Sequence, residues 1–137
     1  MISKKAEYAI IALADLATLP PNQKTTTREI VARRKIPPNL LAQLLPVMRA
    51  AGWIKSNRGA GGGVFLCKDP AQITLREAIE LIDGPINITR CLFQSMPCEN
   101  KPSCPLRDVW KEAQEKMLHV FDKTTIGELA AKIAAAG

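Results

Sequence analysis

The sequence predicts a mostly α-helical fold with one small β-hairpin, in the order of a winged helix-turn-helix, followed by a long C-terminal helix. Three observations predict this class. Two short helical patterns are separated by only a few residues, a glycine-rich hairpin pattern directly follows the second, and a narrow apolar seam runs through residues 106–120. A helix pair joined by a short turn, with a hairpin behind it, has the element order of that fold.

Periodicity and capping signals mark the helices of the first third of the chain. Apolar residues recur at helical spacing over residues 3–19, and two prolines then stop the pattern. A short helix is expected from Thr26 to about Arg34, because Thr26 and Glu29 have the spacing of a capping box. Pro38 suits the first position of a third helix, which should end at the next glycine.

A β-hairpin is expected after the third helix. Short strand patterns at residues 53–56 and 64–67 flank a turn that holds Asn57, Arg58 and several glycines. Strand patterns around such a turn predict a hairpin, which would be the wing of the fold. The glycines do not fit a nucleotide-binding loop, because Val64 stands where a dinucleotide fingerprint needs glycine and no Gly-Lys-Ser/Thr follows.

The second half of the chain reads as helix, loop and helix. Thr74 and Glu77 again have the spacing of a capping box and open a helix to about Asp83. Residues 86–104 hold two prolines and three cysteines and read as a loop. The apolar seam that follows favours a long helix pairing with its copy in a second chain, packing on its own domain being the alternative. The residues after 124 are expected to form a short tail.

The net charge of +6 is unevenly distributed along the chain. Residues 1–70 carry 11 lysines and arginines against 4 acidic residues, whereas the remainder carries 8 against 9. A basic half joined to a near-neutral half is typical of a polyanion-binding module linked to a sensing or dimerising one, although a random surface imbalance is the alternative. We therefore divide the chain into a DNA-binding winged helix-turn-helix domain at 1–84, a cysteine-bearing loop at 85–104, and a dimerisation helix with C-terminal tail at 105–137.

Double-stranded DNA as partner gives particular roles to the third helix and the hairpin. Asn39 and Gln43 lie four residues apart on one helix face, where both amides can read adenine edges; ordinary solvated side chains are the alternative. Arg58 at the wing tip is suited to a narrow minor groove, and Gly59 and Gly61 let the backbone approach closely. The other expected DNA contacts, mainly with phosphates, are Arg28, Arg33, Arg34, Lys35, Pro38, Arg49 and Lys55.

Cys91, Cys98 and Cys104 lie within 14 residues, with gaps of six and five. In a chain without a secretory signal pattern, such a group is more often a metal or redox site than a disulfide frame. Zinc sites usually include a closely spaced cysteine pair, which is absent here, so the spacing favours an iron–sulfur cluster. Three reduced thiols or a reversible disulfide remain as alternatives. Cys67, alone on a strand, is expected to be a small buried residue.

Other classes of protein find little support in the sequence. No apolar run reaches the roughly 18 residues of a membrane span, and acidic residues interrupt the basic and apolar N-terminal stretch, so we expect a cytoplasmic protein. The chain has a single histidine and no evident nucleophile–base pair, so we expect neither an enzyme nor a small-molecule substrate.

Taken together, these segments resemble the Rrf2 family of transcriptional regulators, in its iron–sulfur type, over nearly the whole chain. The resemblance implies a homodimer whose long helices cross, with wings that reach the minor groove. It also implies a [2Fe–2S] or [4Fe–4S] cluster on the three clustered cysteines. The matching segments are Ala6–Ala9, Ile36–Leu44, Gly52–Gly63, Ile73–Ile79, Asp83–Pro85, the cysteines, Trp110 and Thr125–Leu129.

The sequence departs from the iron–sulfur members of that family at several positions. The first cysteine gap is six residues rather than five, Ala42 replaces a glutamate that helps choose between DNA sites, and Arg107 replaces a histidine ligand. Arginine stays protonated and cannot ligate iron. Glu7 lies where a nitric-oxide-sensing member has an aspartate that reaches the cluster from the partner subunit, and is our candidate fourth ligand; a solvated first-turn carboxylate is the alternative. Asp108 is a weaker candidate.

The sequence thus predicts a DNA-binding regulator, a repressor or dual regulator, that senses iron, redox state or nitric oxide through its metal centre. One alternative is a cluster-free regulator of the same fold, of a thiol-redox or zinc-bound kind. Another is a regulator that acts through a partner enzyme.

Overall fold

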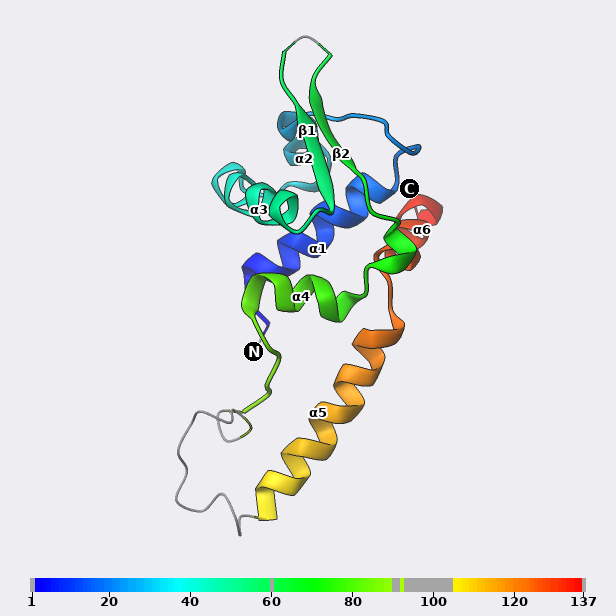
Figure 1. The fold of residues 1–137 in the computed structure, drawn as a ribbon. Helices are drawn as coiled ribbons and strands as arrows, with labels where there is room; N and C mark the ends of the chain where they lie inside the picture. The colour runs from blue at the N-terminus through cyan, green and yellow to red at the C-terminus, as the bar shows by residue number, and fades with distance from the viewer. Residues whose placement is uncertain (1, 60, 90–91, 93–104, 137) are drawn as a thin grey trace.

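The structure, a computed structural model, describes residues 2–59, 61–89, 92 and 105–136. It confirms the predicted class: helices with a single two-stranded antiparallel sheet among the described residues (Figure 1). The described elements are α1 (Lys4–Ala17), α2 (Thr27–Arg34), α3 (Pro38–Ala50), β1 (Ile54–Asn57), β2 (Gly63–Leu66), the short 3₁₀ helix η1 (Pro70–Gln72), α4 (Leu75–Asp83), α5 (Pro105–Lys123) and α6 (Ile126–Ala136).

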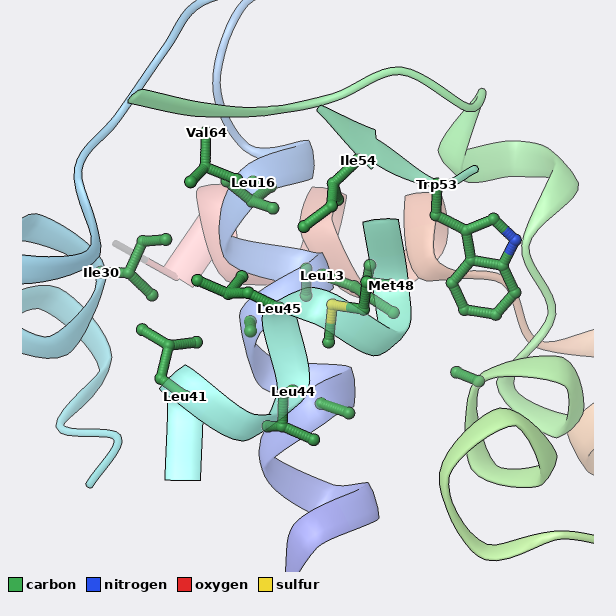
Figure 2. Close-up of a cluster of buried hydrophobic side chains, with 14 of the residues drawn as sticks. Leu13, Leu16, Ile30, Leu41, Leu44, Leu45, Met48, Trp53, Ile54 and Val64 are labelled. Carbon is green, nitrogen blue, oxygen red and sulfur yellow. The ribbon is translucent and has the colours of Figure 1, made fainter. Parts of the chain in front are cut away.

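Helix α1 lies at the centre of the fold, because α2, α3, α4 and α6 all pack against it. Much of its length is buried, and four of the buried residues are alanines, which let neighbouring helices approach closely. Figure 2 shows the core that results, where side chains of α1, α2, α3 and both strands meet. Its labelled members are Leu13, Leu16, Ile30, Leu41, Leu44, Leu45, Met48, Trp53, Ile54 and Val64.

The α2–α3 pair starts and turns as its local sequence dictates. Thr26 caps α2, and the reciprocal bonds with Glu29 complete the predicted capping box. Helix α2 ends at Lys35, which takes up a left-handed conformation with φ of 54°. Pro38 then opens α3, as predicted, and Gly52 follows its end with φ of 81°.

The wing is the β1–β2 hairpin, paired from Ile54 with Leu66 to Asn57 with Gly63. Thr25 lies beside the tip-side half of β2 and pairs with Val64 in an antiparallel bridge through hydrogen bonds of 2.9 and 2.7 Å. Gly63 permits this pairing, since a Cβ atom there would lie 2.7 Å from the carbonyl oxygen of Thr25. The segment before α2 is therefore joined to the wing.

Helix α4 opens at the predicted capping box of Thr74 and Glu77 and packs along α1. The chain after residue 124 corrects a prediction: it forms the 11-residue helix α6, where only a short tail was expected. Helix α6 packs on α1 and places Ile126 and Ala130 in buried positions. A backbone bridge between Thr74 and Thr125 holds the α5–α6 junction against the start of α4.

Helix α5 projects away from the rest of the structure (Figure 1). None of its residues is fully buried within one chain, although Met117, Leu118 and Phe121 pack beside α4. Leu106, Val109 and Val120 each leave more than half of their surface exposed. Among the described helices, none is long and apolar enough to cross a bilayer.

Candidate functional site

Helix α3 is held by one face and presents the other to solvent. Leu41, Leu44 and Met48 are buried against the core, whereas Asn39 and Gln43 lie exposed on the opposite face. Pro38, also exposed, stands with them at the start of the helix. The structure therefore gives the two amides the free, rigidly mounted position that reading base edges in a major groove requires.

The wing tip carries the second group of predicted residues. Arg58, Gly59 and Gly61 are all exposed, and the two glycines have φ of 88° and 75°. Side chains rarely adopt this left-handed conformation, so the glycines allow a tight turn just beyond Arg58. Asn57 lies at the base of the turn. With its side-chain amide oriented so that the oxygen faces Lys24, that oxygen accepts a hydrogen bond from Lys24 Nζ at 2.8 Å.

The predicted phosphate contacts fall into two groups. Arg28 lies exposed in the first turn of α2 and Arg49 exposed in the last turn of α3. An apolar hollow between α2 and α3 lies beside Arg28, and Val31 and Pro38 are among the residues that line it. Arg28 and Arg49 thus remain available to bind phosphate groups on either side of α3.

Arg33 and Arg34, also predicted as phosphate contacts, are both bonded to a carboxylate within the fold. Arg33 donates to both carboxylate oxygens of the fully buried Asp15, from Nε at 3.1 Å and from Nη2 at 2.8 Å. Arg34 Nε donates to the same carboxylate at 2.7 Å. Hydrogen bonding to Asp15 raises the pKa of the Arg33 guanidinium above its ordinary value, so this group stays charged.

The role of Asp15 was not predicted, although the sequence carries a signal for it. The residue is the only acidic one in an otherwise apolar stretch of the first helix, Ala12 to Leu16. A carboxylate buried in such a stretch needs a cationic partner, since an unpaired buried charge is strongly destabilising.

Cys91, Cys98 and Cys104 lie outside the described residues. Within the described part of the chain, no group of three or more metal-binding side chains occurs. Glu7 is exposed on α1, with Lys4 Nζ 3.8 Å from its carboxylate. Cys67 is exposed rather than buried, because it lies just beyond the end of β2; its thiol donates to the carbonyl of Gly52 at 3.2 Å.

The chemistry of the donor set can still be compared with an iron–sulfur centre. Cysteine thiolates are the usual ligands of such a centre, normally four in number; the three cysteines leave one position, which an exposed carboxylate such as that of Glu7 could fill. Three positions after the last cysteine in the sequence, Arg107 Nε is buried and has no hydrogen-bond partner among the described residues. A guanidinium cannot ligate iron, but its charge is of the sign that stabilises thiolates. The residues present therefore fit the group.

Two short helices, the second exposing an amide-bearing face, and a wing with an arginine at its tip define a winged-helix DNA-binding protein. The sequence pattern of the Rrf2 family, described as an iron-dependent transcriptional regulator, matches residues 2–132. The chain belongs to the Rrf2 family of transcriptional regulators.

Relatives of known name agree with this assignment. The transcriptional regulator IscR of Cronobacter sakazakii is 30% identical over 128 residues, which cover 93% of this chain and 78% of that protein. Among solved structures, the global cysteine regulator CymR of B. subtilis superposes with a TM-score of 0.79 at 29% identity, covering 96% of this chain and 97% of that one. IscR of T. potens gives a TM-score of 0.78 at 26% identity, covering 99% and 90%.

Proposed function

We propose that this protein is a cytoplasmic, homodimeric repressor that reads DNA with α3 and the wing, under the control of an iron–sulfur cluster held by Cys91, Cys98 and Cys104. The observation that carries the DNA-reading half is the shared exposure of Asn39 and Gln43 on a helix whose other face is fixed in the core. The basic charge of residues 1–70 supports the same surface.

A homodimer is supported by the exposed apolar surface of α5. A 19-residue helix that fully buries none of its residues within its own chain and exposes Leu106, Val109 and Val120 has little of the packing that stabilises helices in proteins. Pairing with the same helix of a second copy covers that apolar surface. It also gives the molecule two α3 helices, as the two half-sites of a DNA operator require.

The sensing half rests on the donor set. When bound, a cluster supplies a centre whose iron content and oxidation state respond to iron, oxygen or nitric oxide. The chain provides three thiolates from residues 91–104, and the partner's α1 provides the carboxylate of Glu7 as fourth ligand. This cysteine segment lies between α4, which packs on α1, and α5. A conformational change in residues 91–104 can therefore act both on α4, which packs on the winged helix-turn-helix, and on α5, the proposed dimerisation helix.

Iron and acid-labile sulfide in anaerobically purified protein test the sensing half. We expect both elements in the wild type and their loss, with the visible absorbance, in Cys98→Ala. Cys67→Ala is the matched control, because Cys67 is an exposed cysteine outside the predicted ligand set. Wild-type protein that contains neither element, or Cys98→Ala that keeps both, would contradict the proposal. The same preparations of Glu7→Gln test the fourth ligand by cluster lifetime in air.

Binding of Arg58→Ala to an operator duplex tests the DNA-reading half. Loss of one charge-assisted hydrogen bond, about 1.5 kcal/mol, predicts binding weakened about tenfold. The slope of log affinity against log salt concentration should also become shallower by about 0.9. Gln43→Ala, in contrast, should relax base preference at one position and leave the salt slope unchanged. Unaltered binding by both variants would place the DNA-reading surface elsewhere.

A cluster-free regulator of the same fold is the second candidate. The observation that favours it is the close superposition on the structure of CymR, the global cysteine regulator of B. subtilis. In this form two of the three thiols form a disulfide reversibly on oxidation, or all three hold zinc. Metal analysis that finds zinc, or a thiol count that falls on mild oxidation without iron in the protein, would favour it over the cluster. Co-purification of an enzyme with the full chain would instead support action through a partner enzyme.

A further inference from the structure

We infer that Arg33 is a positioning residue for the wing: anchored by buried Asp15 and bonded to Thr25, it sets where Arg58 lies relative to α3. The inference rests on the proposed role of the wing in DNA binding. It gives a function to the one fully buried carboxylate among the described residues, which holds α2 to α1 and, through Arg33, holds the segment before α2 as well.

The first link is the anchor. Asp15 is 0% exposed and accepts hydrogen bonds from Arg33 Nε, Arg33 Nη2 and Arg34 Nε. The fork of Arg33 spans both carboxylate oxygens, so its guanidinium has a single orientation. Because Asp15 belongs to the central helix, this fixes the C-terminal end of α2 to the core.

The second link joins the anchor to the wing. Arg33 Nη2 also donates to Thr25 Oγ1 at 2.9 Å, and Thr25 is only 3% exposed. The backbone of Thr25 in turn exchanges both hydrogen bonds with Val64 of β2. The absence of a side chain at Gly63 lets β2 approach the segment that holds Thr25. The orientation of the guanidinium is thus passed directly to a wing strand.

The third link reaches the tip. Val64 pairs with Ser56, and Gly63 pairs with Asn57, the residue before Arg58. Arg58 therefore directly follows a residue that is paired with β2, the strand that Thr25 anchors. The contact of Lys24 with the amide of Asn57 connects the segment before α2 to β1 as well.

The alternative role for Arg33, a phosphate contact, does not fit these contacts. Its Nε and Nη2 atoms are bonded to Asp15 and Thr25, and its Nη1 atom lies 3.9 Å from the carboxylate of Glu29. The side chain is 33% exposed, and Glu29 stands beside its remaining free atom. An acidic neighbour at that place disfavours an approaching phosphate.

A double-mutant cycle on operator binding by the full-length protein tests the inference. Thr25→Val removes the acceptor of Arg33 without changing charge or volume greatly, and Arg58→Ala removes the tip. If the two act through the same wing placement, Thr25→Val weakens binding about fivefold alone, and by less than about twofold once Arg58 is absent. Thr18→Val is the matched control, because it removes a threonine hydroxyl whose hydrogen bond goes to the backbone carbonyl of Asp15 and not to Arg33. It should bind as the wild type does.

Arg33→Lys gives an independent reading, with folding checked by circular dichroism. Lysine keeps the charge but cannot bond both Asp15 oxygens and Thr25 at once. We expect binding weakened as in Thr25→Val, with the effect again lost in the Arg58→Ala background. Near wild-type binding by Arg33→Lys, or effects of Thr25→Val and Arg58→Ala that simply multiply, would overturn the positioning role. Unchanged binding by Arg58→Ala alone would instead overturn the proposed use of the wing, and this inference with it.

Discussion

Replacement of Lys35 by glycine should stabilise the protein. Lys35 ends α2 with φ of 54°, a left-handed conformation that costs a residue with a side chain about 1–2 kcal/mol. Glycine adopts it freely but loses about 0.4–1 kcal/mol more chain entropy on folding. The difference leaves a gain of about 0.5–1 kcal/mol in the free energy of unfolding. For a domain of this length, that corresponds to a rise in Tm of about 2–4 °C.

Two further variants isolate the cause in the same thermal and urea unfolding experiments. Lys35→Ala removes the charge and most of the side chain but keeps a Cβ atom, so it should bring no gain. Asn22, at φ of 64°, is the other described non-glycine residue in this conformation, and asparagine tolerates it well. Asn22→Gly should therefore gain less than Lys35→Gly. Equal stabilisation by Lys35→Ala would refute strain at the backbone as the reason.

Three other outcomes are expected. Leu13→Ala should lower the free energy of unfolding by about 3–4 kcal/mol in urea titrations, because Leu13 is completely buried; a loss below about 1 kcal/mol would mean that the core around it is loosely packed. Hydrogen bonds from Thr26 lower the pKa of Glu29 below 4.5, so the contribution of Glu29 to the stability of α2 is present above pH 4.5 and is lost as the pH falls through the lowered pKa. In Glu29→Gln, the free energy of unfolding should therefore depend less on pH in that acidic range. The same pH dependence in the variant and the wild type would contradict this role of Glu29. Arg76→Ala removes the bonds to Glu80 and Asp122 and should speed hydrogen exchange in α5. The free energy of unfolding should change by less than about 1 kcal/mol, because these side chains are partly exposed. Unchanged exchange in α5 would mean that the Arg76–Asp122 ion pair does not hold that helix.

The features predictable from the sequence were those set by neighbouring residues. The capping boxes at Thr26 and Thr74 involve a residue and its third successor, and both form as expected. Pro38 likewise marks the start of α3 through its own fixed backbone angle. The exposed face of α3 followed from helical periodicity, since its apolar residues could face only one way.

The features that escaped prediction depend on partners far along the chain. Arg33 and Arg34 looked like free cations because Asp15 lies 18 and 19 positions before them. Helix α6 was read as a tail because its alanine-rich sequence carries little periodic signal, and contacts with α1 are what bury one face of it. Cys67 was misassigned because a strand pattern does not show where the strand leaves the core.

The attachment of α5 has a mechanical consequence. Its C-terminal end is pinned to the body, where Leu75 N donates to Thr124 O at 2.8 Å and Ile126 N donates to Ile73 O at 2.9 Å. The 19 residues of the helix extend about 28 Å from that pivot. A tilt of only about 5° there displaces the distant end at Pro105 by about 2.5 Å, by the leverage of a rod of that length. A small change in the angle of α5 at this junction would thus move the far end of the helix by about the width of an atom.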